Sequence, residues 1–180
     1  MTLVGILRAD MGLQVADFRA AERTFQLLTQ VAGRAGRGET PGLVLLQTYL
    51  PDHYAIAAAA RQDYEAFVRA ELPFRRELGY PPFGHLALVR GEGPDDGLVT
   101  AAMEALARDL APIAERAGAT VLGPCPAPLA RLRGAYRRHL LIKAGTRRAV
   151  RIAAERVVAW AERSRRGVRV LLDIDPIHLA

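Results

Sequence analysis

The residues best suited to chemistry form one short run, Gln30–Arg37, with the sequence QVAGRAGR. Arg34 and Arg37 are three residues apart, a spacing that lets both guanidinium groups share one face of a helix end and contact phosphate oxygens. Gly33 and Gly36 let a ligand approach the backbone closely. Arginines placed in this way can stabilise the charge that develops on a γ-phosphate. The competing interpretation is that they complement the helix dipole and cap its end.

A second group of candidates is the basic stretch in the last third of the chain. From Leu129 to Ala180, thirteen Lys and Arg residues stand against four Asp and Glu residues, and the whole chain has a formal charge of +6. This local surplus predicts a surface that binds nucleic-acid phosphates. The candidates are Arg131, Arg133, Arg137, Arg138, Lys143, Arg147, Arg148 and Arg151. The alternative is that these side chains only solvate an exposed helix and strand edge.

Several kinds of site are missing from the sequence. There is no G-x-x-x-x-G-K-[ST] phosphate loop, and no Asp-Glu pair followed by a helicase-type histidine that would hold magnesium. Cys125 is the single cysteine, so neither an intramolecular disulfide nor a cysteine metal site is expected. Asp173 and Asp175 project to the same side of a predicted strand but lack a third ligand. We therefore expect no metal site.

The elements that must position the first group are an α/β layer. Apolar runs at 2–7 and 43–48 predict buried strands of a parallel sheet, and helical spacing of apolar residues predicts a helix over 17–33 that begins at Asp17. Residues 52–79 are expected to be helical in two pieces, with the break near Pro73. The first part of the chain therefore reads as strand, helix, strand and a helical connector.

The paired prolines in Tyr80–Gly84 mark the expected boundary to a second unit. Beyond it, the patterns predict the order β-α-β-β-α-β, with a stiff extended loop at Gly123–Pro128. The predicted ranges are 85–90, 95–117, 119–122, 136–143, 146–163 and 168–173. This order is typical of a ferredoxin-like fold, in which two helices cover one face of a four-stranded antiparallel sheet.

Residues Asp17–Arg37 resemble, nearly residue for residue, the stretch around helicase motif VI in PriA-type replication-restart DNA helicases. The resemblance continues in order to the end of the chain and covers essentially all of it. The further matching segments are Pro41-Gly42, Gln47-Thr48, Pro51–His53, Asp63-Tyr64, Tyr80–Phe83, Leu122–Pro124, Tyr136-Arg137 and Asp173–Pro176.

The resemblance implies a fold and a set of site residues. Residues 1–61 would be the tail of a RecA-like helicase lobe 2, residues 62–79 a helical connector, and residues 80–180 a ferredoxin-like DNA-binding domain. Gln30, Arg34 and Arg37 would face the nucleotide, and Gly33 and Gly36 would shape that loop. ATP and magnesium would be cofactors of the complete parent enzyme, and we expect none for this chain alone.

The implied function is ATP-dependent 3′-to-5′ DNA unwinding at stalled forks, followed by primosome assembly. The implied partners are forked or branched DNA, single-stranded DNA-binding protein (SSB), other primosome proteins and the missing helicase lobe 1. Members of the family often carry Arg where this chain has Ala135 and an amide where it has His139, which argues against an intact pocket for the SSB tail. We expect a fragment or a split gene product that cannot hydrolyse ATP by itself.

Two other functions compete with this one. The first is a stand-alone adaptor that binds DNA or primosome proteins and has no catalytic role, and the second is a ribosome-associated RNA binder. No apolar run approaches the roughly 20 residues of a membrane span, and the N-terminus lacks a signal-type segment. We therefore expect a cytoplasmic protein without a membrane partner.

Overall fold

The computed structural model describes residues 3–35, 42–163 and 167–179 of the 180. The chain divides into two compact units, Met1–Phe74 and Arg75–Ala180, and the division falls inside a helix. The predicted α/β class is confirmed, because both units combine helices with strands. Within the described ranges, no helix is long and apolar enough to cross a membrane.

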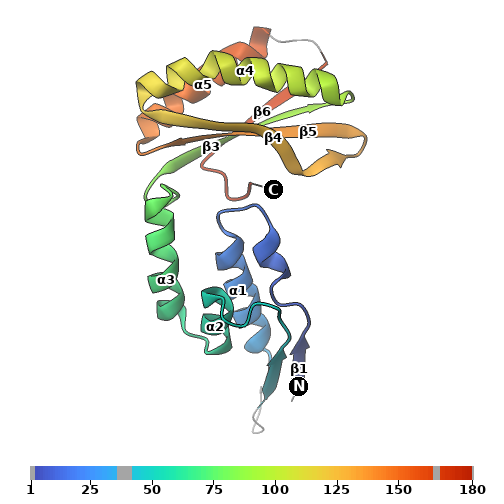
Figure 1. Ribbon diagram of the computed structural model, residues 1–180, viewed down its shortest axis with the longest axis vertical. Helices are drawn as coiled ribbons and strands as arrows, with labels where there is room; N and C mark the ends of the chain where they lie inside the picture. Colours follow the sequence, from blue (N-terminus) through green and yellow to red (C-terminus); the bar gives the residue numbers. More distant parts are fainter. Residues whose placement is uncertain (1–2, 36–41, 164–166, 180) are drawn as a thin grey trace. The chain divides into compact units, whose positions relative to one another are not determined.

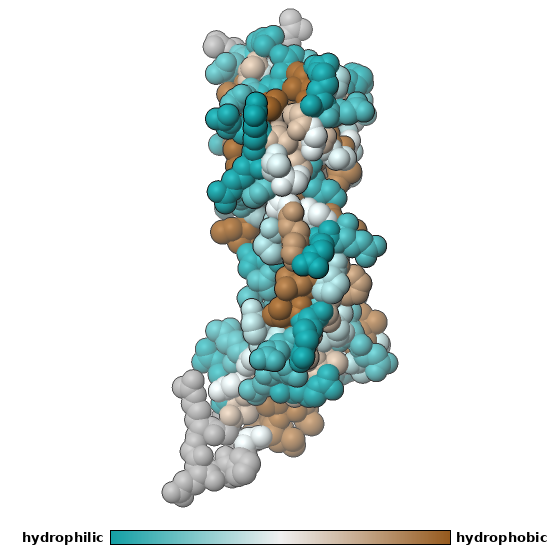
Figure 2. Space-filling model, turned by 90° about the vertical axis from the view of Figure 1, so that its left-hand side faces the viewer, coloured by the Kyte–Doolittle hydropathy of each residue, from teal (hydrophilic) through white to brown (hydrophobic). Residues whose placement is uncertain are grey.

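The first unit is built on a pair of parallel strands. β1 (Leu3–Ile6) and β2 (Leu43–Leu46) run side by side, and the chain between them forms the short 3-10 helix η1 (Met11–Gln14) and α1 (Ala20–Ala32) (Figure 1). Alternate residues of each strand face the core, so Ile6 and Leu46 pack on it. The other face keeps three leucines more than half exposed, namely Leu3, Leu43 and Leu45. Apolar side chains also gather at the lower end of the surface in Figure 2.

Two helices follow, α2 (Tyr54–Ala60) and α3 (Tyr64–Glu77). The predicted break near Pro73 is wrong, because Pro73 lies inside α3. The chain breaks instead at Gln62, which has a φ of 54°, and at Asp63, whose Oδ1 accepts a hydrogen bond of 2.8 Å from the Ala66 amide. A side-chain cap therefore decides where α3 begins, and α3 continues although Pro73 has no N–H to donate.

The second unit contains six elements in the predicted order β-α-β-β-α-β. They are β3 (His85–Gly93), α4 (Asp96–Ala117), β4 (Ala119–Leu132), β5 (Ala135–Ala144), α5 (Arg147–Arg163) and β6 (Arg169–Ile174). The strands form one antiparallel sheet in the order β4-β5-β3-β6, and both helices cover the same face of it (Figure 1).

The core of the second unit follows the alternation of the central strands. Ala87 and Val89 of β3 and Leu140 and Ile142 of β5 are buried between the sheet and the two helices. Gly91 continues this row, and a Cβ there would lie 2.5 Å from the Met103 Sδ, so any side chain at this position would have to displace Met103 of α4. The residues that alternate with these, among them Arg90 and Glu92 of β3 and Arg137 and His139 of β5, point to the other face.

One predicted loop is a strand. Gly123–Pro128 was expected to be a stiff extended loop, but β4 runs through it to Leu132. Register shifts interrupt the pairing with β5 between Leu122 and Cys125 and again between Pro126 and Arg131. Bulges of this kind, on an edge strand, are where a sheet tolerates proline.

Candidate functional site

The end of α1 presents the predicted nucleotide-facing residues. Gln30 and Arg34 are exposed and four residues apart, so they lie on the same side of the helix end. The helix ends with an α-helical bond from the Gly33 amide to the Thr29 carbonyl at 3.0 Å and a tighter turn in which the Arg34 amide donates to the Val31 carbonyl at 3.1 Å. Arg34 has no ion pair within the part of the chain that is described, so its guanidinium is available to a ligand. Gly36 and Arg37 lie outside the described residues.

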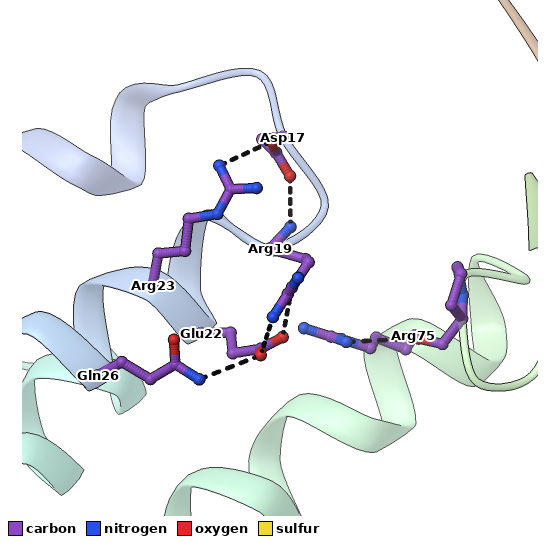
Figure 3. A network of polar contacts seen from close by, with 7 residues as sticks. Asp17, Arg19, Glu22, Arg23, Gln26 and Arg75 are labelled. Carbon is purple, nitrogen blue, oxygen red and sulfur yellow. Dashed lines mark hydrogen bonds and ion pairs between the residues drawn. The ribbon is translucent and has the colours of Figure 1, made fainter. Parts of the chain in front are cut away.

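The other end of α1 is held by a chain of charged side chains (Figure 3). Asp17 was expected to begin the helix, but α1 begins at Ala20. The Asp17 carboxylate instead accepts a hydrogen bond of 2.9 Å from the Arg19 amide and pairs with Arg23 at 3.0 Å. The Arg19 guanidinium binds Glu22 at 2.6 Å, and the Gln26 amide also donates to Glu22 at 3.3 Å. These contacts stabilise the first turns of the helix that carries Gln30 and Arg34.

A buried aspartate, which the sequence analysis did not single out, joins the carboxyl ends of β1 and β2. Asp10 is 1% exposed, and its Oδ1 accepts hydrogen bonds from the Thr48 hydroxyl at 2.9 Å and the Tyr49 amide at 3.1 Å. The Tyr49 amide, together with the Thr48 hydroxyl, holds the pKa of Asp10 below its usual value, although burial acts in the opposite direction. An acidic residue four positions after the first strand was the available signal.

The basic residues of the second unit fall into three groups, and the first lies on the turn between β4 and β5. Arg133 and Gly134 form this turn with positive φ angles of 50° and 83°, the geometry of a tight hairpin. Arg133 is exposed, and Arg131 is exposed with its guanidinium 5.0 Å from the centroid of the Tyr136 ring. Neither arginine has an acidic partner among the described residues.

The second group lies at the start of α5. Arg147, Arg148 and Arg151 are all exposed, and the Thr146 hydroxyl accepts a hydrogen bond of 3.3 Å from the Ala149 amide at this end. Arg151 approaches Glu155 at 3.7 Å, but both side chains are about 70% exposed, so water screens this pair. Arg147 and Arg148 have no acidic partner in the described part of the chain.

The third group is committed to contacts inside the unit. Arg137 is buried and donates from Nε to Glu92 Oε1 at 3.1 Å, and Arg138 donates to both carboxylate oxygens of Asp96 at 2.9 and 3.1 Å. Lys143 donates from Nζ to the Leu78 carbonyl at 2.7 Å. These three side chains hold strands and helix ends together, so the expectation of a single basic surface must be corrected.

The first two groups also lie far apart. β5 separates the hairpin arginines from those of α5, and a ten-residue strand is about 30 Å long. The exposed arginines therefore form two patches at opposite ends of β5. The basic residues along the strand do not share one face, because alternation turns Arg137 and Lys143 to one face and Arg138 to the other.

His139 lies beside this network on the face of the sheet that the helices leave uncovered. It pairs in register with Arg90 of β3, and both the His139 Nε2 and the Arg90 Nε are buried without a hydrogen-bond partner. Burial and the nearby charges of Arg90 and Arg137 lower the pKa of His139 to about 4, with Glu92 acting in the opposite direction. The imidazole is therefore neutral at pH 7.

A shallow hollow of about 740 Å³, open to solvent over most of its extent, lies at the hairpin end of the sheet. The end of β3, the β4–β5 turn and the residues that lead into β6 form its walls, and Arg133 and Arg169 are among its lining residues. No pattern in the sequence predicts it, because its walls come from three segments that are distant along the chain.

The two aspartates considered as metal ligands do not share a strand. β6 ends at Ile174, and Asp175 follows it with a φ of 52° and its amide bonded to the Leu86 carbonyl at 2.9 Å. The Asp175 Oδ1 lies 3.7 Å from the His85 Nδ1. Within the described ranges, no group of three or more His, Cys, Asp or Glu side chains could hold a metal ion.

Comparison with known proteins gives one family. The model of the primosomal protein N C-terminal domain matches residues 76–177. The replication restart protein PriA of Bacillus subtilis is 40% identical over 175 residues, which cover 97% of this chain and 22% of that protein. PriA of Synechocystis is 41% identical over 179 residues, covering 99% of this chain and 21% of that protein. PriA of Haemophilus influenzae is 36% identical over 180 residues, covering 100% and 24%. The chain thus spans less than a quarter of the length of these relatives.

Proposed function

The chain belongs to the family of the primosomal protein N C-terminal domain, as part of a replication restart protein of the PriA type, and from this we propose that it contacts forked or branched DNA during replication restart. In the complete enzyme, an ATP-dependent 3′-to-5′ DNA helicase of the cytoplasm, it would form the end of the second motor lobe and the domain that follows. Its other partners would be helicase lobe 1, SSB and further primosome proteins.

The observation that carries the DNA-binding proposal is a set of exposed cations without acidic partners. Arg131 and Arg133 on the hairpin, and Arg147 and Arg148 at the start of α5, have no ion pair within the described residues. A guanidinium that is already exposed and unpaired loses little when it binds a phosphate, and counterions released from the DNA favour the complex. Two such patches about 30 Å apart suit a ligand with more than one duplex arm better than a single site would.

The proposed fold assignments rest on topology. The strands β1 and β2 are parallel neighbours, and α1 lies between them in the sequence. This arrangement supports the assignment of the first unit to the end of a RecA-like lobe. The sheet order β4-β5-β3-β6, with α4 and α5 on one face, supports a ferredoxin-like second unit. For the complete enzyme we propose domain boundaries after residues 61 and 79. The two compact units of this chain meet elsewhere, between Phe74 and Arg75.

The nucleotide role is proposed for the end of α1. Arg34 fits a γ-phosphate contact because it is exposed and unpaired, and Gln30 lies on the same side of the helix end. Gly33, Gly36 and Arg37 are the other proposed nucleotide-site residues of the run Gln30–Arg37. ATP with magnesium would supply the free energy for unwinding in the complete enzyme. No set of residues in the described part of this chain fits the magnesium ion, so lobe 1 would have to hold it.

We propose an SSB contact at the place where members of the family often carry an arginine and an amide. This chain has Ala135 and His139 at these two positions. Ala135 offers no charge, and His139 is buried and neutral rather than an amide. The buried Arg137 and the Arg90 beside His139 still supply positive charge at this level of the sheet. A weaker contact to an acidic peptide is therefore expected here than in relatives that carry the additional arginine.

Fluorescence anisotropy of the 180-residue chain with forked and linear duplexes tests the DNA-binding proposal. We expect affinity to fall with salt, and Arg147→Ala combined with Arg148→Ala to reduce the log-log slope by about 1.8, since each phosphate contact contributes about 0.9. Arg61→Ala combined with Arg69→Ala, which removes two exposed charges from the first unit, is the matched control. An unchanged slope in the double variant, or equal affinity for heparin and forks, would contradict the proposal.

The alternative is a non-catalytic adaptor, which the missing phosphate loop favours. The two functions differ at Arg34, which only a helicase needs for nucleotide turnover. Substituting the arginine at this position in a full-length relative distinguishes them, because an adaptor role would leave turnover unchanged.

A further inference from the structure

We propose that the tip of the β4–β5 hairpin is a wedge that contacts the branch point of forked DNA. Leu132 would lie against the last base pair, and Arg131 and Arg133 would bind phosphates of the two strands that separate there. This inference rests on the DNA-binding function proposed above and assigns the recognition of the branch to one apolar side chain. It goes beyond that function because exposed arginines alone bind any duplex.

The tip of the hairpin lies beyond the end of β3. The pairing of β3 with β5 ends opposite Tyr136, whereas the pair of Leu132 with Ala135 and the turn that follows it have no β3 residue beside them. The last five residues of β4 are all exposed. A Cβ on Gly134 would have no atom within 4 Å, so the turn borders open space. The tip is therefore free to enter a ligand rather than to enclose one.

Leu132 is the apolar part of the tip. Its side chain is 44% exposed, and it is not among the residues that line the hollow at this end of the sheet. Inside a continuous duplex the flat faces of the bases are covered by stacking, but at a branch the last base pair loses a neighbour. An apolar side chain can cover that free face, as apolar wedges do at kinked base steps. Such a side chain suits a base pair better than a peptide, whose side chains bind in grooves.

Arg131 and Arg133 flank Leu132 in the sequence and supply the cations. The Arg131 guanidinium lies 5.0 Å from the centroid of the Tyr136 ring, and neither arginine has an acidic partner among the described residues. Arg133 has a φ of 50°, a conformation that glycine or asparagine adopts at lower cost. A charged residue therefore occupies a turn position that the backbone alone would give to another residue, as expected where the charge has a function.

Glu92 is the carboxylate at this end of the sheet, and its charge is offset. Its Oε1 accepts a hydrogen bond from Arg137 at 3.1 Å and lies 3.7 Å from the Arg90 Nε. Glu92 pairs in register with Arg137, which is two residues, or about 7 Å, along β5 from Ala135. The SSB contact proposed above depends on the charges of Arg90 and Arg137, so an acidic peptide and a DNA branch would not compete for the same cations.

The test measures the preference of the full 180-residue chain for a branch by fluorescence anisotropy. A forked duplex is compared with a linear duplex that has the same number of phosphates, at the same salt concentration. We expect the fork to bind about fivefold more tightly, which corresponds to burial of the exposed part of a leucine side chain. Leu132→Ser should remove this preference and leave the affinity for the linear duplex unchanged, because no charge is lost.

Three further variants separate the wedge from charge and from general apolar surface. Leu132→Met keeps an apolar side chain and should retain the preference. Val158→Ser is the matched control, because it removes an apolar side chain of similar exposure, 47%, from α5, and it should also retain the preference. Arg131→Ala with Arg133→Ala should weaken both DNAs. Circular dichroism and melting curves establish that each variant is folded.

A spectroscopic measurement locates the contact on the DNA. A 2-aminopurine base at the branch point should change its emission when the unaltered chain binds, since Leu132 alters the stacking of that base. The same base in the middle of a duplex arm should not respond, and neither position should respond to the Leu132→Ser protein.

The outcomes distinguish the wedge from the DNA-binding function on which it rests. Equal affinity of the unaltered chain for the two DNAs, or a fork preference that persists in a folded Leu132→Ser protein, would overturn the wedge and leave the DNA-binding proposal intact. Failure of both DNAs to bind would overturn both proposals. If Arg131→Ala with Arg133→Ala abolished the binding of an acidic peptide and left both DNAs unaffected, the tip would belong to the peptide and the wedge would be overturned.

Discussion

Arg137 on β5 donates from Nε to Glu92 Oε1 on β3 at 3.1 Å, and the arginine side chain is only 7% exposed. This contact joins the two central strands at a level where Arg90 approaches the same carboxylate oxygen at 3.7 Å. An arginine that the sequence suggested for DNA binding therefore neutralises a carboxylate inside the unit.

Arg137→Ala is expected to lower the free energy of unfolding by about 3 kcal/mol, because truncation leaves Glu92 without its strongest partner in a largely desolvated place. Urea denaturation followed by circular dichroism measures this change. Arg147→Ala removes an exposed arginine and serves as the control, with an expected change within about 0.5 kcal/mol. Equal stability of the two variants would show that the pair contributes nothing to folding.

The stability of the second unit should depend on pH through His139. Its pKa lies near 4 in the folded protein and near 6.5 when the residue is free, so the unfolded chain binds more protons between these values. Stability should therefore be highest above pH 6.5 and fall by up to about 3 kcal/mol as the pH drops to 4. His139→Gln should flatten the dependence in this window. Asp109 also titrates, but its pKa is lowered from 3.8 by the hydrogen bond from Arg156, so its effect begins below the window.

Asp10 is expected to hold the carboxyl ends of β1 and β2 together in the first unit. Asp10→Ala leaves the Thr48 hydroxyl and the Tyr49 amide without their acceptor in a partly buried place, and the loss of these hydrogen bonds is destabilising. Amide hydrogen exchange at Tyr49 should become faster. In a thermal melting curve, the first unit should unfold at a lower temperature. Thr48→Val is the comparison variant, because it removes the Thr48 bond to Asp10 and the bond from the Leu50 amide to the Thr48 hydroxyl but keeps the Tyr49 bond to Asp10, so Tyr49 should stay protected. Unchanged protection of the Tyr49 amide in Asp10→Ala would rule this role out.

The purified chain should not hydrolyse ATP, with or without forked DNA, because its sequence holds no phosphate loop. In a full-length relative, substituting the arginine at the position of Arg34 should lower turnover by roughly 10³ to 10⁵, as for an arginine finger, with DNA affinity unchanged. A coupled phosphate-release assay and anisotropy measure the two quantities. Turnover by this chain that depends on Arg34 would contradict the expectation, and a loss of both quantities in the relative would indicate a folding defect.

Local patterns in the sequence were sufficient for most of the elements. The alternating apolar residues of β3 and β5 and the helical spacing in α4 and α5 predicted the order of the second unit, because each pattern reflects a single buried face. The helix break near Pro73 was predicted wrongly. Proline only weakens a helix by one hydrogen bond and a local clash, whereas Asp63 begins a new helix by accepting the Ala66 amide. A helix start that depends on the geometry of one side chain is harder to predict from sequence than a helix whose apolar residues recur at a regular spacing.

The sequence by itself determined that this chain carries the run QVAGRAGR at Gln30–Arg37, an excess of arginine after Leu129 and the family to which it belongs. Only the tertiary structure decided which arginines are available. Register between β3 and β5 places Arg137 beside Glu92, and the packing of α4 places Asp96 beside Arg138, while Arg133 and Arg147 remain without acidic partners among the described residues. Charge is a property of each residue, but whether that charge is free depends on neighbours that are distant along the chain and meet only when the sheet and helices pack together.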